Sequence, residues 1–322
     1  MTSVDRVMVT GGAGFIGSNL VDRLLAEGVS VDVVDDLSTG SLANLAEARG
    51  HASRGLSFFQ VSVCDSSLTE LMQRRKPRIL YHLAAQADVR RSMTDPVYDA
   101  EVNLIGSIRV LDAARRSGVQ KVVYAASGGT LYGELGSPDI AASEKFPRAQ
   151  SSFYGTSKAA VLDYLEGFRS GYDLEFTALA LGNVYGPRQD PKGEAGVVSI
   201  FGRYMLAGKA TTIFGDGSQT RDFVFVDDVV DAFFRASDQG GGLVINVGSG
   251  SGTTVIQLHD AVSRVVGYSK QPEFAPMRPG EIRYSRLDNS AALLHLGWKP
   301  WTSIEQGISR TVAWLDKPGS PE

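Results

Sequence analysis

Tyr154 and Lys158 stand four residues apart, a spacing that places a phenol and an ammonium group on one face of a helix. A phenol can take a proton from a hydroxyl group when a nearby positive charge lowers its pKa toward neutrality. Ser127 follows an earlier β-rich run and could hydrogen-bond the same reacting hydroxyl, although Thr130 is a competing candidate. Because the chain has 11 tyrosines, the spacing alone is a weak signal, and its weight depends on the surrounding sequence.

A glycine-rich loop near the N-terminus indicates what this chemistry would act with. Gly11, Gly14 and Gly17 lie between a short apolar run and an amphipathic segment, and the same loop contains Phe15 and Ile16. The first glycine permits a tight turn, the second lets the backbone approach a pyrophosphate, and the third lets the following helix pack on the sheet. The start of that helix offers unpaired N–H groups to phosphates. We therefore expect a dinucleotide to bind here.

An acidic residue completes this pattern. Asp35 ends the next β-rich run, about 20 residues past the glycines, where an acid accepts hydrogen bonds from an adenosine ribose and repels a 2′-phosphate. This position predicts NAD(H) rather than NADP(H). The alternative is that Asp35 and its neighbour Asp36 are loop aspartates exposed to solvent, with no role in binding. The positive nicotinamide ring of NAD⁺ would help Lys158 to lower the pKa of Tyr154. The phenolate could then take a proton while a hydride leaves for the nicotinamide.

Alternating strand and helix patterns supply the elements that position these residues. β-rich runs occur at 7–9, 31–34, 56–61, 79–82, 121–125 and 176–181, with helix-length segments at 96–117 and 157–170. Pro96 suits the first turn of a helix and Gly118 its C-terminal cap. The alternation predicts an α/β fold with a Rossmann-type doubly wound parallel sheet, and ligands of such sheets lie beyond the carboxyl ends of the strands.

The pattern becomes irregular after about residue 185, where Gly-Pro-rich pieces appear. We expect residues 1–182 to form an NAD-binding Rossmann domain whose sheet also receives about 222–247. Residues 183–221 and 248–322 would form a smaller C-terminal region that binds the substrate.

Composition narrows the class of protein. The 322 residues are 43% hydrophobic, which is enough for a sizeable core, and the net charge of −4 gives no footprint for nucleic acid. Apolar runs of about 18 residues are absent, and the first strand begins too early to leave room for a secretory signal. Cys64 is the only cysteine. We expect a soluble cytoplasmic protein without metal, membrane or nucleic-acid partners.

Several motifs in a fixed order resemble those of the extended short-chain dehydrogenase/reductases, and within that group the nucleotide-sugar epimerases of the UDP-glucose 4-epimerase type. The resemblance covers nearly all of the chain. The matching pieces are Thr10 to Gly17, Asp35 to Gly40, His82 to Gln86, Asn103, Ser127 to Gly129, Tyr132-Gly133, Tyr154 to Lys158, Asn183 to Gln189, Gly215 to Gly217 with Arg221-Asp222, and Arg278 to Glu281.

The resemblance implies a mechanism. Tyr154 would act as the base, Lys158 would hold the nicotinamide ribose and tune Tyr154, and Ser127 would position the 4-hydroxyl of the sugar. A hydride would pass from C4 to NAD⁺, the 4-keto sugar would turn about its diphosphate, and the hydride would return to the other face. Net redox is zero, so the NAD can stay tightly bound.

The resemblance also implies the binding residues. For NAD these are the glycine loop and Asp35, together with Asp36, Ser38, Thr39, Gly40, Ser62, Val63, Leu83, Ala84, Ala85, Gln86, Asn103, Tyr154 and Lys158. For a UDP-sugar they are Gln86, Ser127, Tyr154, Asn183, Arg188, Val198, Phe214, Arg221, Arg278 and Glu281. Within this second set, Asn183, Arg221 and Arg278 would hold the diphosphate, Glu281 the uridine ribose, and Phe214 would lie near the uracil. Helices from Pro96 and Ser157 are the candidates for a homodimer interface.

Three positions depart from the family pattern. Ser62 stands where an aspartate usually reaches the adenine, and Ala180 replaces a frequent arginine before Asn183. Ser285 occupies, by approximate alignment, a position where a bulky residue excludes N-acetyl sugars. A small residue there leaves room for larger substituents at C2 of the sugar.

Alternative functions remain open. A UDP-glucuronate 4-epimerase would need a cation near C6, which Arg188, Lys192 or Arg90 could supply, and a UDP-N-acetylhexosamine 4-epimerase would use the space at Ser285. A nucleotide-sugar 4,6-dehydratase needs acidic residues straight after the catalytic hydroxyl, but Ser127 is followed by Gly-Gly-Thr. A non-catalytic NAD sensor would lack Tyr154 or Lys158. His82 is a candidate catalytic base, but a single histidine in a strand more often has a structural role.

Overall fold

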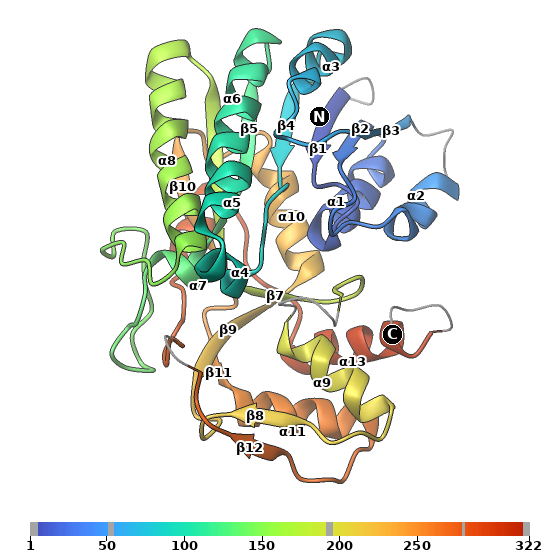
Figure 1. Cartoon of the computed structure of the whole chain (residues 1–322), viewed down its shortest axis with the longest axis vertical. Helices are drawn as coiled ribbons and strands as arrows, with labels where there is room; N and C mark the ends of the chain where they lie inside the picture. Colours follow the sequence, from blue (N-terminus) through green and yellow to red (C-terminus); the bar gives the residue numbers. More distant parts are fainter. Residues whose placement is uncertain (1–5, 51–54, 191–195, 279–280, 318–322) are drawn as a thin grey trace.

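The computed structural model describes residues 6–50, 55–190, 196–278 and 281–317, and its largest element is a seven-stranded parallel sheet (Figure 1). The strand order is β10-β6-β5-β4-β1-β2-β3, and every neighbouring pair is parallel. This order reverses direction between β1 and β4, as in a doubly wound Rossmann sheet, so the predicted fold class is confirmed. The strands are β1 (Arg6–Thr10), β2 (Ser30–Asp35), β3 (Leu56–Gln60), β4 (Ile79–His82), β5 (Lys121–Ser127), β6 (Glu175–Leu181) and β10 (Leu243–Val247).

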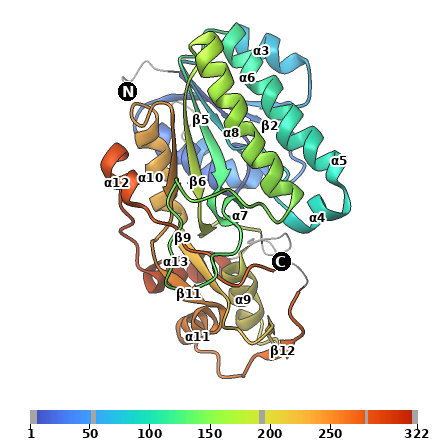
Figure 2. The same ribbon diagram turned by 90° about the vertical axis from the view of Figure 1, so that its left-hand side faces the viewer.

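Helices cover both faces of this sheet, which explains why its inner strands read as continuous apolar runs. Figure 2 shows the sheet between one layer that contains α6 and α8 and another that contains α10 and α12. The first layer consists of α3 (Ser67–Arg75), α6 (Gly106–Arg116) and α8 (Phe153–Tyr172). The second consists of α1 (Phe15–Ala26), α10 (Val226–Ala236) and α12 (Ser290–Leu296), with η1 (Leu42–Leu45) and α2 (Ala46–Gly50) beside α1.

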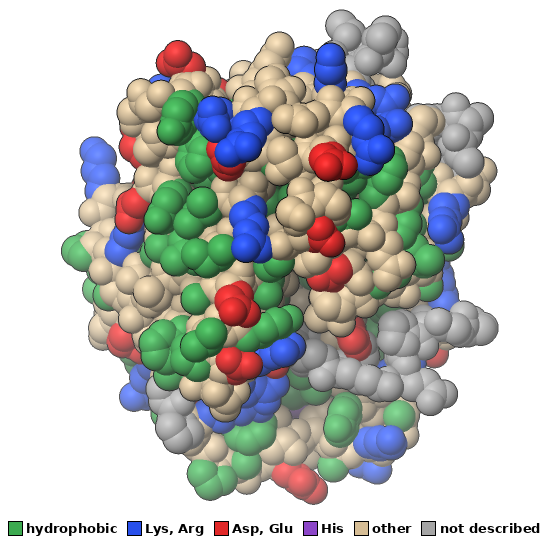
Figure 3. Space-filling model, turned by 45° about the horizontal axis from the view of Figure 1, so that its top comes forward, with side chains coloured by type: hydrophobic (Ala, Val, Ile, Leu, Met, Phe, Trp, Pro, Cys, Tyr) green, Lys and Arg blue, Asp and Glu red, His purple; other side chains and the backbone are tan. Residues whose placement is uncertain are grey.

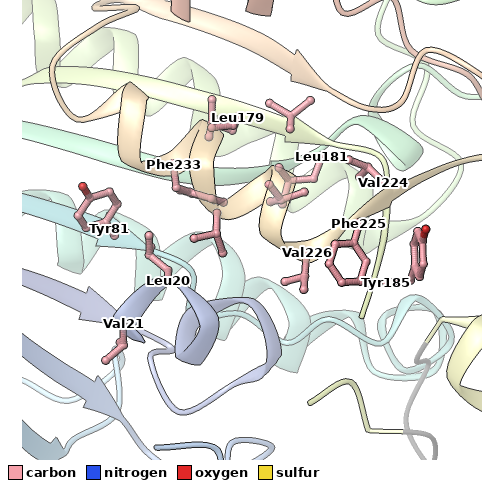
Figure 4. Packing of buried hydrophobic residues seen from close by; sticks show 14 of the residues in the cluster. Leu20, Val21, Tyr81, Leu179, Leu181, Tyr185, Val224, Phe225, Val226 and Phe233 are labelled. Atoms are coloured by element: carbon pink, nitrogen blue, oxygen red, sulfur yellow. The ribbon is translucent and has the colours of Figure 1, made fainter. Parts of the chain in front are cut away.

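The core on the α1 side continues past the sheet into the smaller region. Figure 4 shows Leu20 of α1, Tyr81 of β4 and Phe233 of α10 in the same cluster as Phe225 and Tyr185. The last two residues lie outside the main sheet. Burial of apolar surface therefore fixes the smaller region against the sheet that carries the glycine loop.

The predicted helix at 96–117 is confirmed as a continuous helical run. It comprises α5 (Pro96–Asp99), a π-helical stretch η3 (Ala100–Ile105) and α6, and it follows α4 (Val89–Thr94). Asp95 caps its first turn by accepting a hydrogen bond from the Tyr98 N–H, and Gly118 has a φ of 73° past its end. The second predicted helix begins earlier than expected, at Phe153, because the Ser152 side chain caps it. Tyr154 therefore lies in its first turn.

The smaller region is built from short strands and three helices. Its strands are β7 (Asn183–Tyr185), β8 (Thr212–Phe214), β9 (Thr220–Phe225), β11 (Gly252–Thr254) and β12 (Glu273–Ala275), and its helices are α9 (Val197–Leu206), α11 (Val255–Val266) and α13 (Ile304–Leu315). They form a three-stranded sheet in the order β11-β9-β7, and a β12-β8 pair. α9, α11 and α13 pack on one another in the lower half of Figure 1.

One expectation for 222–247 is wrong. The main sheet receives only β10 from this stretch, since β9 pairs with β7 and β11. The sequence could not show this, because β9 is a short apolar run that suits either sheet equally well. The domain boundaries at 182, 221 and 248 stay a prediction. In the described part of the chain, no helix is long and apolar enough to cross a membrane.

Candidate active site

The three residues expected to do chemistry meet where β5 ends and α8 begins. Ser127 is the last residue of β5, and it lies close enough to Tyr154 to lower the pKa of that phenol. Lys158, one turn further along α8, donates to the carbonyl of Ala125 at 3.0 Å. Its Nζ lies 4.8 Å from the centre of the Tyr124 ring and 6.0 Å from that of Tyr154. The structure thus brings together the residues that the sequence singled out.

Thr130 was the competing hydroxyl, and its geometry is different. It lies on the short helix α7 (Gly128–Leu131), and its Oγ1 donates to the backbone carbonyl of Ser127 at 3.5 Å. Ser127, and not Thr130, is the hydroxyl residue that acts on the pKa of Tyr154.

The electrostatics differ from the expectation of a lowered tyrosine pKa. Burial raises the pKa of Tyr154 to about 12, with the hydrogen bond from Ser127 lowering it and the negative charge of Asp99 raising it. Burial lowers the pKa of Lys158 to about 8, against an opposing effect of Asp99. The predicted lowering is therefore not a property of the chain alone, and the positive charge of a bound nicotinamide would have to supply it.

His82 serves the structure, as expected. Its Nδ1 lies 2.8 Å from Thr10 Oγ1 and its Nε2 lies 2.9 Å from Ser107 Oγ, so both ring nitrogens have partners. Burial, with the nearby charge of Lys158, lowers the pKa of His82 to about 3. The ring is therefore neutral and ties β4 to β1 and α6.

The glycine loop has the close approaches that a dinucleotide site requires. Gly11 has a φ of 71°, and a Cβ on it would lie 2.6 Å from the backbone nitrogen of Ala84. A Cβ on Gly17 would collide with the carbonyl oxygen of Gly11. Gly14 precedes α1 without any side chain that caps the helix. The N-terminus of α1 thus presents its N–H groups to whatever lies over the loop, which fits a pyrophosphate.

Asp35 lies beside this loop, but it is more deeply engaged than the sequence suggested. Its Oδ2 accepts from the Ala13 N–H and its Oδ1 from the Leu37 N–H, both at 2.9 Å, and the residue is 6% exposed. Burial raises the pKa of the Asp35 carboxyl despite these bonds. Asp35 therefore shapes the loop that carries Ser38, Thr39 and Gly40. Each carboxylate oxygen keeps a further lone pair for a ribose hydroxyl.

Asp36, after β2, and Ser62, after β3, interact although they lie in different loops. Burial would raise the pKa of Asp36, but hydrogen bonds from Ser38 and from the Ser62 side chain outweigh it and lower the pKa. Val63, next in the chain, is buried. A contact of Ser62 or Val63 with the adenine stays a prediction.

The loop after β4 passes directly under the glycine turn. Leu83 donates its N–H to the Thr10 carbonyl at 3.1 Å, and Ala84 and Ala85 follow. Gln86 is held at both backbone atoms by the Asn103 side chain, which donates to the Gln86 carbonyl and accepts from its N–H at 2.9 Å. The sequence analysis did not single out Asp99, which lies one turn before Asn103. The only sign of Asp99 in the sequence is an acidic residue one helical turn before Asn103, on the same face of the predicted helix.

The second half of the site carries the residues expected to hold UDP. Arg221 on β9 lies 3.3 Å from an oxygen of Glu281, and burial lowers the pKa of the Arg221 guanidinium. The other oxygen of Glu281, Oε2, is buried and has no hydrogen-bond partner in the described structure. Arg278 lies over the ring of Phe214, with its Cζ 3.8 Å from the ring centre. An orphaned acceptor beside two arginines fits a ligand with hydroxyls and phosphates.

Asn183 and Val198 frame this half of the site. A Cβ on Gly129 would lie 3.7 Å from Asn183 Oδ1, so this amide faces the loop that follows Ser127. Val198 is fully buried in α9 and belongs to the core around Phe201. Pro279 and Gly280, between Arg278 and Glu281, lie outside the described residues.

Arg188, expected as a substrate contact, pairs with residues of the elements beside the glycine loop, and its contact with a substrate stays a prediction. It has a φ of 73°, and its guanidinium pairs with Asp22 of α1 at 2.6 Å and Glu47 of α2 at 3.3 Å. Both carboxylates contact Nη2, while Nη1 of Arg188 is buried and has no hydrogen-bond partner in the described structure. Of the other two cations considered for a uronate, Arg90 is exposed on α4, and Lys192 lies outside the described residues.

The Ser285 segment runs past the catalytic loop. Ser285 is 6% exposed and donates its N–H to the Thr220 carbonyl at 3.3 Å. Two residues on, a Leu287 methyl group lies 2.7 Å from where Gly128 would place a Cβ. Gly128 would also place that Cβ 2.9 Å from the carbonyl of Ala180. The segment thus borders the loop between Ser127 and the sheet.

Comparison with known proteins identifies the family. A model of the NAD dependent epimerase/dehydratase family matches residues 7–248. The chain belongs to this family. Its NAD dependence agrees with the glycine loop, where the backbone approaches described above leave no room for side chains.

Individual members of the family are similar over almost the whole chain. A UDP-glucose 4-epimerase of Mycolicibacterium smegmatis is 50% identical over 311 residues, which is 96% of this chain and 98% of that protein. The structure of the Thermotoga maritima UDP-glucose 4-epimerase with UDP-glucose has a TM-score of 0.90 and 43% identity, covering 96% of this chain and 98% of that one. The Thermus thermophilus UDP-glucose 4-epimerase in complex with NAD has a TM-score of 0.89 and 40% identity over the same shares.

Proposed function

We propose that this family member is an isomerase that interconverts UDP-glucose and UDP-galactose by NAD-dependent epimerisation at C4 of the sugar. The observation that carries the proposal is that Ser127 and Tyr154 meet where β5 ends and α8 begins, with the Lys158 ammonium one turn away, 6.0 Å from the centre of the Tyr154 ring. The similarity to UDP-glucose 4-epimerases over nearly the full chain supports the same substrate.

The residues of the chain handle the proton, while NAD supplies the redox chemistry. Bound by the glycine loop and Lys158, NAD would supply the reversible hydride transfer at C4 of the sugar. Tyr154, as phenolate, takes the proton from the 4-hydroxyl and gives it back to the same oxygen after the sugar has turned. Ser127 hydrogen-bonds that oxygen, and the Lys158 ammonium favours the charged form of Tyr154.

The UDP part would be held by the second half of the site. Arg221 and Arg278 provide guanidinium groups for the diphosphate, and Asn183 provides an amide near the catalytic loop. The unpartnered Oε2 of Glu281 suits a ribose hydroxyl, and the Phe214 ring offers a face for the base. On the cofactor side, the glycine loop, Asp35 and Asp36, and the segments at Ser62 and Leu83 would hold NAD. A firm hold on the nucleotide leaves the sugar able to turn.

The geometry favours a neutral hexose over the alternatives. A uronate needs a cation near its carboxylate, whereas Arg188 is already paired with Asp22 and Glu47. Dehydration needs an acid after the catalytic hydroxyl, and the short helix α7 has the sequence Gly-Gly-Thr-Leu. Tyr154 and Lys158 are both present, which speaks against a non-catalytic sensor.

A homodimer through the helices beside the site is part of this proposal. Large apolar side chains are exposed on α4, α5, η3 and α8, namely Met93, Val97, Ile105, Phe153 and Tyr164. Figure 3 shows hydrophobic side chains grouped on the left of the molecule, the side on which α8 lies in Figure 1. Size-exclusion chromatography with light scattering would measure the mass of the protein in solution and so test the dimer. The cytoplasmic location stays an expectation from the sequence.

The proposal is tested by giving the purified protein UDP-glucose and UDP-glucuronate side by side. We expect UDP-galactose from the first and little or no UDP-galacturonate from the second. If the protein epimerises UDP-glucuronate but not UDP-glucose, its substrate is the uronate and the proposed substrate is wrong. Formation of a 4-keto-6-deoxy product would indicate a dehydratase instead.

A further inference from the structure

Asp99 is a fully buried carboxylate close to the catalytic pair. It is 0% exposed and lies at the end of α5, one turn before Asn103. Its Oδ2 accepts from Ser157 Oγ at 2.7 Å. Its Oδ1 accepts from the side-chain nitrogens of Asn103 at 2.9 Å and Gln86 at 3.1 Å. Burying a carboxylate costs free energy, because the charge loses its contact with water. The three side-chain donors around Asp99 offset this cost.

The three donors come from three different elements. Gln86 lies in the loop after β4 that passes under the glycine turn, Asn103 lies in η3, and Ser157 lies in α8. Ser157 directly precedes Lys158, and Asn103 holds the backbone of Gln86 through two further hydrogen bonds. Asp99 therefore links the loop expected to contact NAD with the helical turn that carries the catalytic residues.

The charge of Asp99 acts on the same residues. It raises the pKa of Lys158 and that of Tyr154, in each case alongside a larger effect of burial. The other ionisable groups packed around this cluster are Tyr124 of β5, which lies under the ammonium, and His82 of β4. On α4, the Arg91 guanidinium covers the ring of Tyr98, 3.9 Å from its centre, and Asp88 caps the helix.

We propose that Asp99 is a positioning residue for the epimerisation, whose carboxylate fixes the Lys158 turn of α8 against the cofactor loop and balances the Lys158 charge. This inference rests on the proposed function. Asp99 touches neither of the reacting groups directly, and it acts through Ser157, Asn103 and the electrostatic field at Lys158.

Replacement by asparagine separates charge from geometry. Asp99→Asn keeps an acceptor for Asn103 and Gln86, and its amide can donate to Ser157 Oγ. It removes the negative charge, so the pKa values of both Tyr154 and Lys158 fall. In the proposed function Tyr154 works deprotonated and Lys158 protonated, so loss of the Tyr154 proton would set the rising limb of the kcat profile and loss of the Lys158 proton would set the falling limb. Both limbs should therefore move toward lower pH, by about 1 unit, with KM for UDP-glucose nearly unchanged.

Two further variants make the test specific. Ser157→Ala removes one hydrogen bond and leaves the charge, so it should lower kcat by about 10-fold and reduce the NAD retained after dialysis, without moving the limbs. Asp112→Asn is the matched control, because Asp112 lies on the same helical run but pairs with Arg115 and Arg116 near the surface. It should leave the pH profile, NAD content and thermal midpoint unchanged.

Three results distinguish a positioning role of Asp99 from a purely structural one. A folded Asp99→Asn protein with the pH profile of the unsubstituted protein would overturn the inference. If Asp99→Asn does not fold, Ser157→Ala decides, and normal kcat with normal NAD retention would overturn it. Failure of the unsubstituted protein to epimerise UDP-glucose would refute the proposed function instead. In that case, NAD retention across pH in the same variants would still test Asp99.

Discussion

The Nζ atom of Lys158 lies 6.0 Å from the centre of the Tyr154 ring, one helical turn along α8. This relationship follows from a spacing of four residues and from a helix that begins at Phe153. It brings an ammonium close to a phenol whose pKa the Ser127 hydroxyl also lowers. The chain alone nevertheless leaves the pKa of Tyr154 at about 12, so the base becomes effective only with the cofactor in place.

Tyr154→Phe should lower epimerisation of UDP-glucose by about 10²–10⁴-fold, because it removes the proton acceptor and keeps the ring. NAD should stay bound, since the glycine loop is untouched. The measurement is kcat with UDP-glucose together with NAD released on acid denaturation. Tyr172→Phe is the matched control, because Tyr172 ends the same helix with its side chain exposed. Near-normal turnover by the Tyr154 variant would contradict the assignment.

Gly17→Ala should abolish NAD retention and lower the thermal midpoint. The new methyl group would collide with the Gly11 carbonyl, so α1 could not stay close to the loop. Gly167→Ala is the matched control in α8, because nothing lies within 4 Å of its Cβ position. It should stabilise the protein by about 0.5–1 kcal/mol through helix propensity. Equal NAD content in the two variants would refute the role given to Gly17.

Acid should destabilise the protein partly through His82. Its pKa is about 3 in the fold and 6.5 as an ordinary histidine, so between these values the unfolded chain binds more protons. Stability contributed by neutral His82 is therefore full above pH 6.5 and is lost as pH falls toward 3, by at most about 1.4 kcal/mol per pH unit.

Denaturant unfolding of the unsubstituted protein and of His82→Gln, at several pH values, would measure this contribution. The variant should be less stable at pH 7, because the bonds to Thr10 and Ser107 change. It should show a shallower loss of stability between pH 6.5 and pH 3. Parallel curves for the two proteins would show that His82 does not contribute in this way.

Ser285→Tyr should restrict the range of sugars. Ser285 is buried in the segment that borders the catalytic loop, so a large side chain there would fill space beside the sugar. We expect the unsubstituted protein to epimerise UDP-N-acetylglucosamine as well as UDP-glucose, and the tyrosine variant to keep only UDP-glucose. Ser285→Ala should behave like the unsubstituted protein. If Ser285→Tyr loses activity on both sugars while Ser285→Ala keeps both, Ser285 does not select between the two sugars and the prediction is wrong.

The sequence predicted the features that depend on local spacing. The glycine loop, the Asp35 position and the Tyr154–Lys158 pair each lie within one short segment, and periodicity is enough to place such segments on strands and helices. It also located the first six strands of the sheet along the chain, although not their order within the sheet, which only the structure gives.

Features that depend on contacts between distant segments were less predictable. The partner strand of β9, the pairing of Arg188 with Asp22 and Glu47, and the burial of Asp99 all join residues far apart in the chain. A side chain's partner cannot be read from its own neighbourhood. The raised pKa of Tyr154 in the chain alone has the same origin, because it comes from burial by distant segments, and the lowering expected with NAD⁺ bound stays a prediction.

The central claim is that the chain inverts C4 of UDP-glucose by moving the C4 hydrogen internally. The most direct test is proton NMR of UDP-glucose incubated with the purified protein in D₂O. The account predicts an accumulating UDP-galactose signal with the C4 proton fully retained. Absence of UDP-galactose, or deuterium at C4 of the product, would contradict it.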